Sequence, residues 1–143
     1  MRRARNAKLI VIALLLSAAM GSTRAEVVVV VSAKSAASNL NAEQVANIFL
    51  GKSSSFPGGG EAVPVDQAEG SPERNEFYSK VAGKSPAQLK AYWAKLIFSG
   101  KGQPPRNVPD SAAVKKEVAD NPNAIGYIDK ASVDNSVKAV LLR

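Results

Sequence analysis

The chain has 143 residues with 19 basic and 12 acidic side chains, a formal net charge of +7, and neither histidine nor cysteine. Within one such chain, serine–histidine–aspartate and cysteine–histidine catalysis, imidazole or thiolate metal sites and disulfides are excluded. We therefore predict no cofactor and no metal site, and we expect the chain not to be an enzyme.

The first 25 residues have the three parts of a secretory signal peptide. A basic start over Met1–Lys8 precedes an apolar run over Leu9–Met20, and small residues then lead to Ala25. The apolar run is shorter than the roughly 20 residues that a membrane-spanning helix needs. We predict cleavage near Ala25 and a domain over residues 26–143 that works in the periplasm or outside the cell, without membrane insertion.

Removing this signal changes the charge balance. Five of the 19 basic residues lie in it, so residues 26–143 carry 14 basic against 12 acidic side chains. These basic residues are scattered among acids, whereas nucleic-acid binding needs them clustered on one face. We therefore expect no nucleic-acid binding. The length of residues 26–143 is sufficient for one domain with its own core.

The first elements predicted after the signal are a strand and a helix. Val27–Val31 is an unbroken β-branched run, which predicts a strand buried on both faces of a helix-covered sheet. Asn41 and Gln44 form the N-cap and capping box of a helix that ends near Gly51. Lys52–Gly60, rich in serine and glycine, is predicted to be a loop.

A second strand and helix are predicted around a turn. Ala62–Asp66 is a short strand in which Pro64 favours an edge or a strand-start position, because proline cannot donate a ladder hydrogen bond. Gln67–Gly70 forms a turn, and Ser71-Pro72 then begins a helix that ends at Gly83.

The remaining chain continues the alternation of helices and strands. Ser85-Pro86 begins a helix that runs to about Phe98, with apolar residues at three- and four-residue spacing. For Lys101–Pro109, which contains prolines and glycine, we predict no helix or strand. After it we predict a helix over Ser111–Asp120 and two strands, Ala124–Ile128 and Val137–Leu142. This alternation predicts an α/β or α+β sheet with covering helices.

The stretch Val65–Arg74 is the most informative for function. A helix start presents unpaired N–H groups and a partial positive charge, so it can bind an anion. The Ser71 hydroxyl and the Arg74 guanidinium could add hydrogen bonds to such a ligand. Ser-Pro-Glu is equally an efficient helix start that needs no ligand, and this alternative stays open.

Three segments, in order and at similar spacing, resemble the phosphate-binding proteins of bacterial ABC transporters: Asn39–Lys52, Val63–Phe77 and Asn121–Tyr127. This resemblance to the phosphate ABC transporter substrate-binding protein family implies a single compact lobe, like one lobe of a type II periplasmic binding protein, with a mixed sheet covered by helices. It implies a small periplasmic solute-binding protein for phosphate or a related oxyanion. An ABC permease or another envelope protein would be its partner.

The resemblance and the turn together place the ligand site at seven residues: Asp66, Gln67, Glu69, Gly70, Ser71, Glu73 and Arg74. Ser71 keeps the serine of the family's Ser-Gly-Thr turn, whereas Pro72 and Glu73 replace its other two residues. Gln67 stands where the family has arginine, and Glu69 stands where it has aspartate. Pro72 removes one N–H donor, and Glu73 adds a negative charge where an anion would approach.

Two other hypotheses follow from the same residues. The chain covers one lobe of a two-lobed family, so it can instead be a ligand-free interaction or regulatory module of the cell envelope. A homodimer would supply the second lobe. A carboxylate-based hydrolase would require Asp66 and Glu69 or Glu73 to converge in a cleft.

Overall fold

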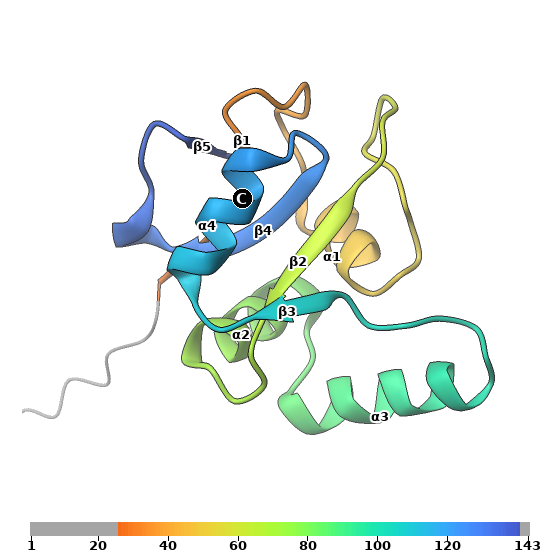
Figure 1. Ribbon diagram of the computed structural model, residues 1–143. Coiled ribbons are helices and arrows are strands. Elements are labelled where there is room, and N and C mark those ends of the chain that lie inside the picture. Colours follow the sequence, from red (N-terminus) through yellow and green to blue (C-terminus); the bar gives the residue numbers. More distant parts are fainter. Residues whose placement is uncertain (1–25, 141–143) are drawn as a thin grey trace, which may run out of the picture.

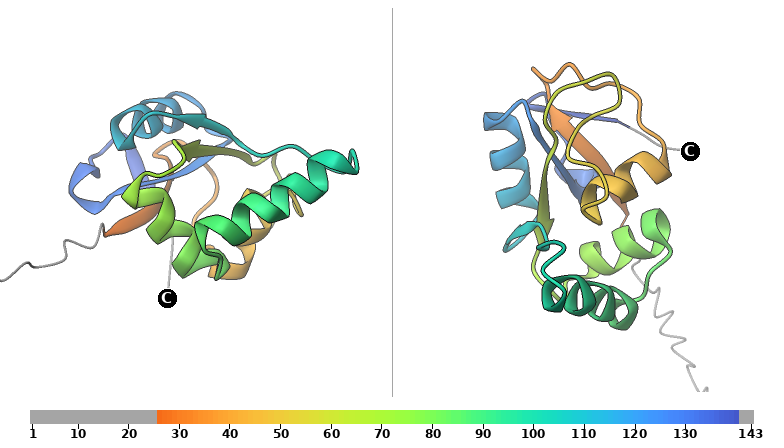
Figure 2. Two further views of the ribbon diagram at one scale, coloured as in Figure 1. Left: turned by 90° about the horizontal axis from the view of Figure 1, so that it is seen from below. Right: turned by 90° about the vertical axis from the view of Figure 1, so that its right-hand side faces the viewer.

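The computed structural model describes residues 26–140, so the predicted signal peptide and residues 141–143 lie outside it. The described chain forms a five-stranded sheet in the order β3-β2-β4-β1-β5, with helices on both faces (Figures 1 and 2). This α/β lobe with a mixed sheet confirms the predicted fold class. Over residues 26–140, no helix combines the length and hydropathy that a bilayer crossing needs.

The elements in chain order are β1 Val27–Ser32, α1 Ala42–Phe49, β2 Val63–Gln67, α2 Pro72–Phe77, a π-helical turn Tyr78–Ala82, α3 Pro86–Phe98, β3 Arg106–Val108, α4 Ser111–Asp120, β4 Ala124–Asp129, a 3-10 turn Lys130–Ser132 and β5 Val137–Ala139. Strand β1 runs antiparallel to both β4 and β5, whereas β2 runs parallel to β3 and β4.

The valine run of β1 packs on both faces of the sheet, as predicted. Val29 and Val31 belong to one buried cluster and Val30 to the other. The first face is covered by α1, α2 and α3 (Figure 2). On this face the rings of Phe77 and Tyr127 stack with centroids 4.1 Å apart. On the opposite face, α4 buries apolar side chains against the sheet.

The predicted helix starts are confirmed at atomic detail. The Asn41 side chain accepts a hydrogen bond from the Gln44 backbone N–H at 2.8 Å, and the Gln44 side chain accepts one from the Asn41 N–H at 3.0 Å. Ser85 caps α3 with the same reciprocal pair of hydrogen bonds. Gly83 adopts φ 62° directly after the π-helical turn, a conformation that glycine accepts without strain.

Strand β3 corrects two expectations. It lies within Lys101–Pro109, where no element was predicted, and it pairs with Val65–Gln67. Strand β2 is therefore flanked on both sides, so the edge position considered for Pro64 is wrong and the strand-start position, the other one predicted, is confirmed. Pro64 is the second residue of β2 and precedes the β3 pairing, so its missing N–H breaks no ladder bond with that strand.

Two helical details were not predicted. Helix α2 ends at Phe77 and the chain continues as a π-helical turn, not as a regular helix, to Gly83. Helix α3 buries only Leu89 and Trp93, while Ile97 at its C-terminal end is 53% exposed. The apolar stripe of α3 is therefore wider than the face that the core covers.

Gly126 in β4 permits the close approach of α4. A Cβ atom there would lie 2.4 Å from Val114 Cγ1 and 3.1 Å from Val118 Cγ2. We expect Gly126→Ala to lower the free energy of unfolding by about 2–3 kcal/mol, measured by urea denaturation. Gly102→Ala is the control, because its Cβ would meet Trp93 at 3.9 Å, an ordinary contact. Equal losses in the two variants would contradict this account.

Candidate functional site

The carboxylate of Asp66 is buried near the end of β2, where the side chain is 2% exposed. It accepts hydrogen bonds from the Tyr78 hydroxyl at 2.5 Å, from the Tyr127 hydroxyl, and from the Gln67 backbone N–H at 2.9 Å. The nearest cation is Arg74, whose Nη1 lies 3.7 Å from the carboxylate. With three hydrogen bonds and a nearby guanidinium, the Asp66 carboxylate is engaged by groups within the protein.

Both tyrosines of this network are held in their neutral form. Burial is the main cause that raises the pKa of Tyr78 and of Tyr127 well above the usual value, and the negative charge of Asp66 raises each further. A protonated phenol is a hydrogen-bond donor, as the buried carboxylate requires.

Gln67 is buried as well. Its side-chain amide donates to the Ser111 hydroxyl at 3.1 Å and to the Tyr127 carbonyl at 3.0 Å. Its own backbone carbonyl accepts a hydrogen bond from Arg74 Nη1 at 3.0 Å. Gln67 thus joins β2 to β4 and α4, and it contributes to the site only through Arg74.

Arg74 is the one member of the predicted set that reaches from this interior to a surface cleft. Besides Asp66 and Gln67, it contacts Tyr78, whose ring centroid lies 5.6 Å from the guanidinium carbon. A guanidinium has five N–H donors, and Gln67 accepts from only one of its nitrogens. The remaining donor capacity of Arg74 is available at the cleft that it lines.

The other predicted residues divide between helix start and cleft. The Ser71 hydroxyl oxygen accepts a hydrogen bond from the Arg74 backbone N–H at 3.1 Å and so caps α2. Glu73 is half-buried in the first turn of α2 and does not line the cleft. Glu69 and Gly70 do line it, and Gly70 adopts φ 86°, which suits glycine.

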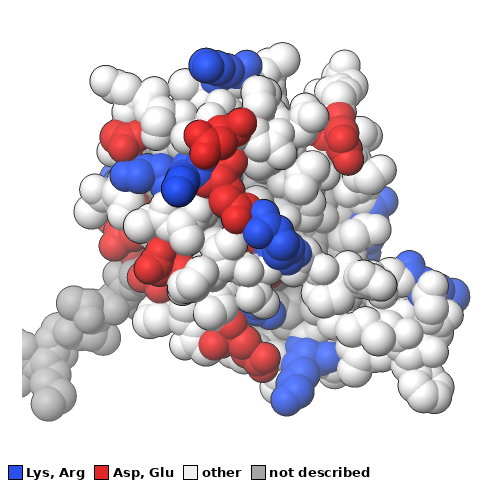
Figure 3. All heavy atoms as spheres, viewed as in Figure 1, with Lys and Arg blue, Asp and Glu red and all other residues white. Residues whose placement is uncertain are grey.

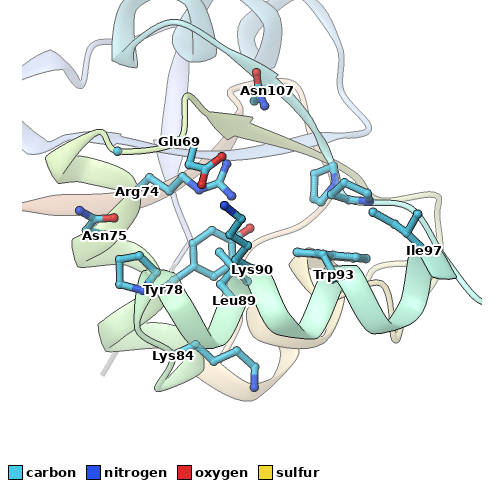
Figure 4. Close-up of a pocket in the computed structure, with 15 residues that line it drawn as sticks. Glu69, Arg74, Asn75, Tyr78, Lys84, Leu89, Lys90, Trp93, Ile97 and Asn107 are labelled. Carbon is cyan, nitrogen blue, oxygen red and sulfur yellow. The ribbon is translucent and has the colours of Figure 1, made fainter.

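This cleft lies between the β2–α2 turn on one side and α3 with the segment that follows it on the other (Figure 4). Its volume is about 320 Å³. The residues that line it are Glu69, Gly70, Arg74, Asn75, Tyr78, Lys84, Pro86, Leu89, Lys90, Trp93, Ala94, Ile97, Pro104, Pro105 and Asn107.

Charged groups gather at one end of the cleft. The Glu69 carboxylate, the Arg74 guanidinium and the Lys90 ammonium lie near one another there (Figure 4). Lys84 also lines the cleft, but its ammonium points away from them and lies 5.2 Å from the centroid of the Tyr92 ring. Elsewhere, on the face seen in Figure 3, basic and acidic side chains are interspersed.

Sequence reasoning missed the second wall of the cleft. Lys90, Trp93 and Pro105 come from α3 and the following segment, which the sequence indicated only as an amphipathic helix and an excursion. No motif in those segments signals a ligand. Their role depends on how α3 lies relative to β2, which is a tertiary property.

The described part of the chain brings together neither a metal site nor the carboxylate pair considered from the sequence. Within residues 26–140, no group of three or more acidic residues is placed to hold a metal ion. Asp66 is engaged by tyrosines inside the lobe, whereas Glu69 is exposed at the turn and Glu73 lies outside the cleft. The convergence that a carboxylate-based hydrolase requires is therefore not formed by these residues.

The fold is similar to solved structures of phosphate-binding transport proteins. A phosphate ABC transporter substrate-binding protein with bound phosphate from Clostridium perfringens matches with TM-score 0.64 and 26% identity, over 81% of this chain and 44% of that one. An ABC-type phosphate transport receptor from Vibrio cholerae matches with TM-score 0.65 and 24% identity, over 81% and 45%. PstS from Borrelia burgdorferi matches with TM-score 0.60 and 14% identity, over 82% and 47%.

These matches establish a shared fold for part of a larger architecture. The chain spans less than half the length of each of these three proteins. No protein-family model and no curated protein matches it in sequence. The structural neighbours therefore show the fold of this lobe, while what the lobe binds is not given by these matches.

The tyrosine network predicts a loss of stability in alkali. Because the pKa values of Tyr78 and Tyr127 are raised above 10.0, the unfolded chain releases both phenolic protons before the folded protein does. Stability from these groups is complete below pH 10 and is lost as the pH rises beyond it. Above about pH 10.5, we expect each tyrosine to lower the free energy of unfolding by about 1.4 kcal/mol per pH unit.

Urea denaturation at stepped pH measures this slope. Tyr127→Phe removes one titrating phenol but retains the ring, so its slope should be shallower by about 1.4 kcal/mol per pH unit. An unchanged slope in Tyr127→Phe would contradict the raised pKa of that tyrosine.

Proposed function

We propose that this chain is a solute-binding protein that takes a small oxyanion, with phosphate as the first candidate, in the cleft between α2 and α3. The observation that carries the proposal is the presence of the Arg74 and Lys90 cations at one end of this cleft. The fold shared with the phosphate-bound Clostridium perfringens protein supports it.

The chemistry of the cleft fits an oxyanion. Arg74 is oriented by the Gln67 carbonyl and by Asp66, so little conformational freedom is lost when it binds a ligand. Charge-assisted hydrogen bonds from a guanidinium and an ammonium to an anion are stronger than neutral ones. Glu69 partly offsets this positive charge, and its carboxylate can accept a hydrogen bond from a protonated oxyanion.

The proposal differs from the sequence-based site in its details. Glu69, Gly70 and Arg74 are retained as ligand residues, because they line the cleft. Asp66 and Gln67 act by positioning Arg74. We assign no ligand contact to Ser71, whose hydroxyl oxygen caps α2, or to Glu73.

The proposed setting follows from the remaining sequence predictions. We propose that residues 1–25 are an export signal and that residues 26–143 work in the periplasm or outside the cell. Delivery of the solute to an ABC permease is the proposed role there. The name of the Vibrio cholerae neighbour, a phosphate transport receptor, supports this setting.

Anion titration of the purified protein tests the binding site. At a concentration about 100 times its dissociation constant, inorganic phosphate should stabilise the folded protein by about 2.7 kcal/mol in thermal denaturation. Lys90→Gln should weaken phosphate binding about tenfold, because one of the two cations is lost. No stabilisation by millimolar phosphate would contradict the proposal.

Lys95→Gln is the matched control for that variant. Lys95 is an exposed lysine on the same helix and lies outside the cleft, so both variants remove one positive charge from α3. We expect Lys95→Gln to leave phosphate affinity unchanged. Equal weakening in both variants would mean that overall charge, and not the cleft, attracts the anion.

A second candidate function, protein contact, is favoured by Phe98. This last residue of α3 is 94% exposed and follows Ile97, which is 53% exposed, so the end of the helix presents two large apolar side chains to the surface. A second copy of this chain is the proposed partner, since the chain spans less than half the length of the phosphate-binding neighbours.

Sedimentation over a wide range of protein concentration tests this candidate. We expect the wild-type mass to rise toward that of a dimer as concentration increases, and Phe98→Ser to remain monomeric at the same concentrations because the apolar contact is lost. A wild-type protein that stays monomeric at all concentrations would contradict the proposed contact between two copies of the chain.

A further inference from the structure

The two ends of the cleft have unlike chemistry. Glu69, Arg74 and Lys90 form the charged end described above. The other end is apolar and holds Trp93 and Ile97 of α3 (Figure 4). Further apolar residues from α3 and the segment after it also line the cleft: Ala94, Pro104 and Pro105. A bare inorganic anion would use the first end and leave the second in contact with water.

Trp93 at the apolar end has an unused hydrogen-bond donor. Its side chain is 6% exposed, and its indole N–H has no partner among the described residues. Buried polar groups in proteins are nearly always paired, and an indole N–H can only donate.

The position of the indole ring is fixed by close packing. A Cβ atom at Gly51 would lie 3.3 Å from the ring, so the ring packs tightly over that glycine. Trp93 and Pro105 also line a second cavity of about 280 Å³ beneath the same segment. The indole ring thus lines both the cleft and this second cavity, and its apolar surface at the cleft can pack against a flat or aliphatic group.

The size of the cleft fits a ligand larger than phosphate. Its volume of about 320 Å³ falls at the lower end of the range of about 300–1,000 Å³ for pockets that enclose organic ligands. Such pockets combine an apolar lining with a few convergent polar groups, as this cleft does.

We infer that the cleft takes a small organic anion, with its anionic head group between Arg74 and Lys90 and its apolar body against Trp93 and Ile97. This inference rests on the proposed anion-binding function and names the ligand class for the same site. A phosphonate, a phosphate ester or a carboxylate supplies the shared head-group chemistry, and an aromatic or branched aliphatic group supplies the body.

Two ligands with the same head group but different bodies show how much the apolar body contributes to the binding affinity. Phenylphosphonate and methylphosphonate carry the same anionic group but differ in apolar surface. We expect phenylphosphonate to bind at least about tenfold more tightly, because its ring removes apolar area from water at Trp93. The chain has one tryptophan, so intrinsic fluorescence reports directly on occupation of the cleft.

A variant pair tests the apolar end without disturbing the core. Ile97 is 53% exposed and lines the cleft, whereas Val133 is 39% exposed and lies outside it. We expect Ile97→Ala to weaken phenylphosphonate binding about threefold and methylphosphonate binding by less, because methylphosphonate lacks the ring that packs there. Val133→Ala should leave the affinity for both ligands unchanged.

The outcomes distinguish this inference from the proposed function. Equal affinities for phenylphosphonate, methylphosphonate and inorganic phosphate would overturn the inference while the anion-binding function stands. Binding of uncharged benzyl alcohol as tightly as phenylphosphonate would also overturn it, because the charged end would then contribute nothing. If no anion binds, both the proposed function and this inference fall.

Discussion

The buried carboxylate of Asp66 is the group on which the arrangement around the cleft depends. A charge that is 2% exposed needs partners, because an unpaired buried charge is strongly unfavourable. Tyr127 donates to it from β4 and Tyr78 from the π-helical turn, so the carboxylate ties the sheet to the helical layer above it. Arg74, held close to the same carboxylate, is thereby placed at the charged end of the cleft. Folding and the candidate ligand site share one buried group.

Local chemistry predicted much of the fold. The reciprocal Asn41–Gln44 cap depends only on residues three apart, and the valines of β1 need only a strand buried on both faces. The three residues of β3 gave no such signal, because they follow prolines and two of them are exposed. Their strand conformation comes from pairing with Val65–Gln67, a contact between segments far apart in the sequence.

The site was only partly predictable from the sequence, because some of its residues are brought together only by contacts between distant segments. The glycine and the capped helix start made the turn from Glu69 to Arg74 recognisable in the sequence. Glu69, Gly70 and Arg74 of this turn do line the cleft. The burial of Asp66 depends on the two tyrosine hydroxyls that reach it, one of them from a strand some sixty residues later. Lys90 and Trp93 look like an ordinary surface lysine and an ordinary core aromatic until α3 is placed opposite the turn.

The most direct test of the cleft as an anion site is NMR of the isotope-labelled protein titrated with inorganic phosphate. The backbone signals of Gly70, Arg74 and Lys90 should shift together and saturate, because these residues line the charged end. Signals of the loop around Ser53 and Phe56, which lines a separate hollow, should stay in place. Absence of shifts in the cleft, or shifts confined to other parts of the lobe, would contradict the account.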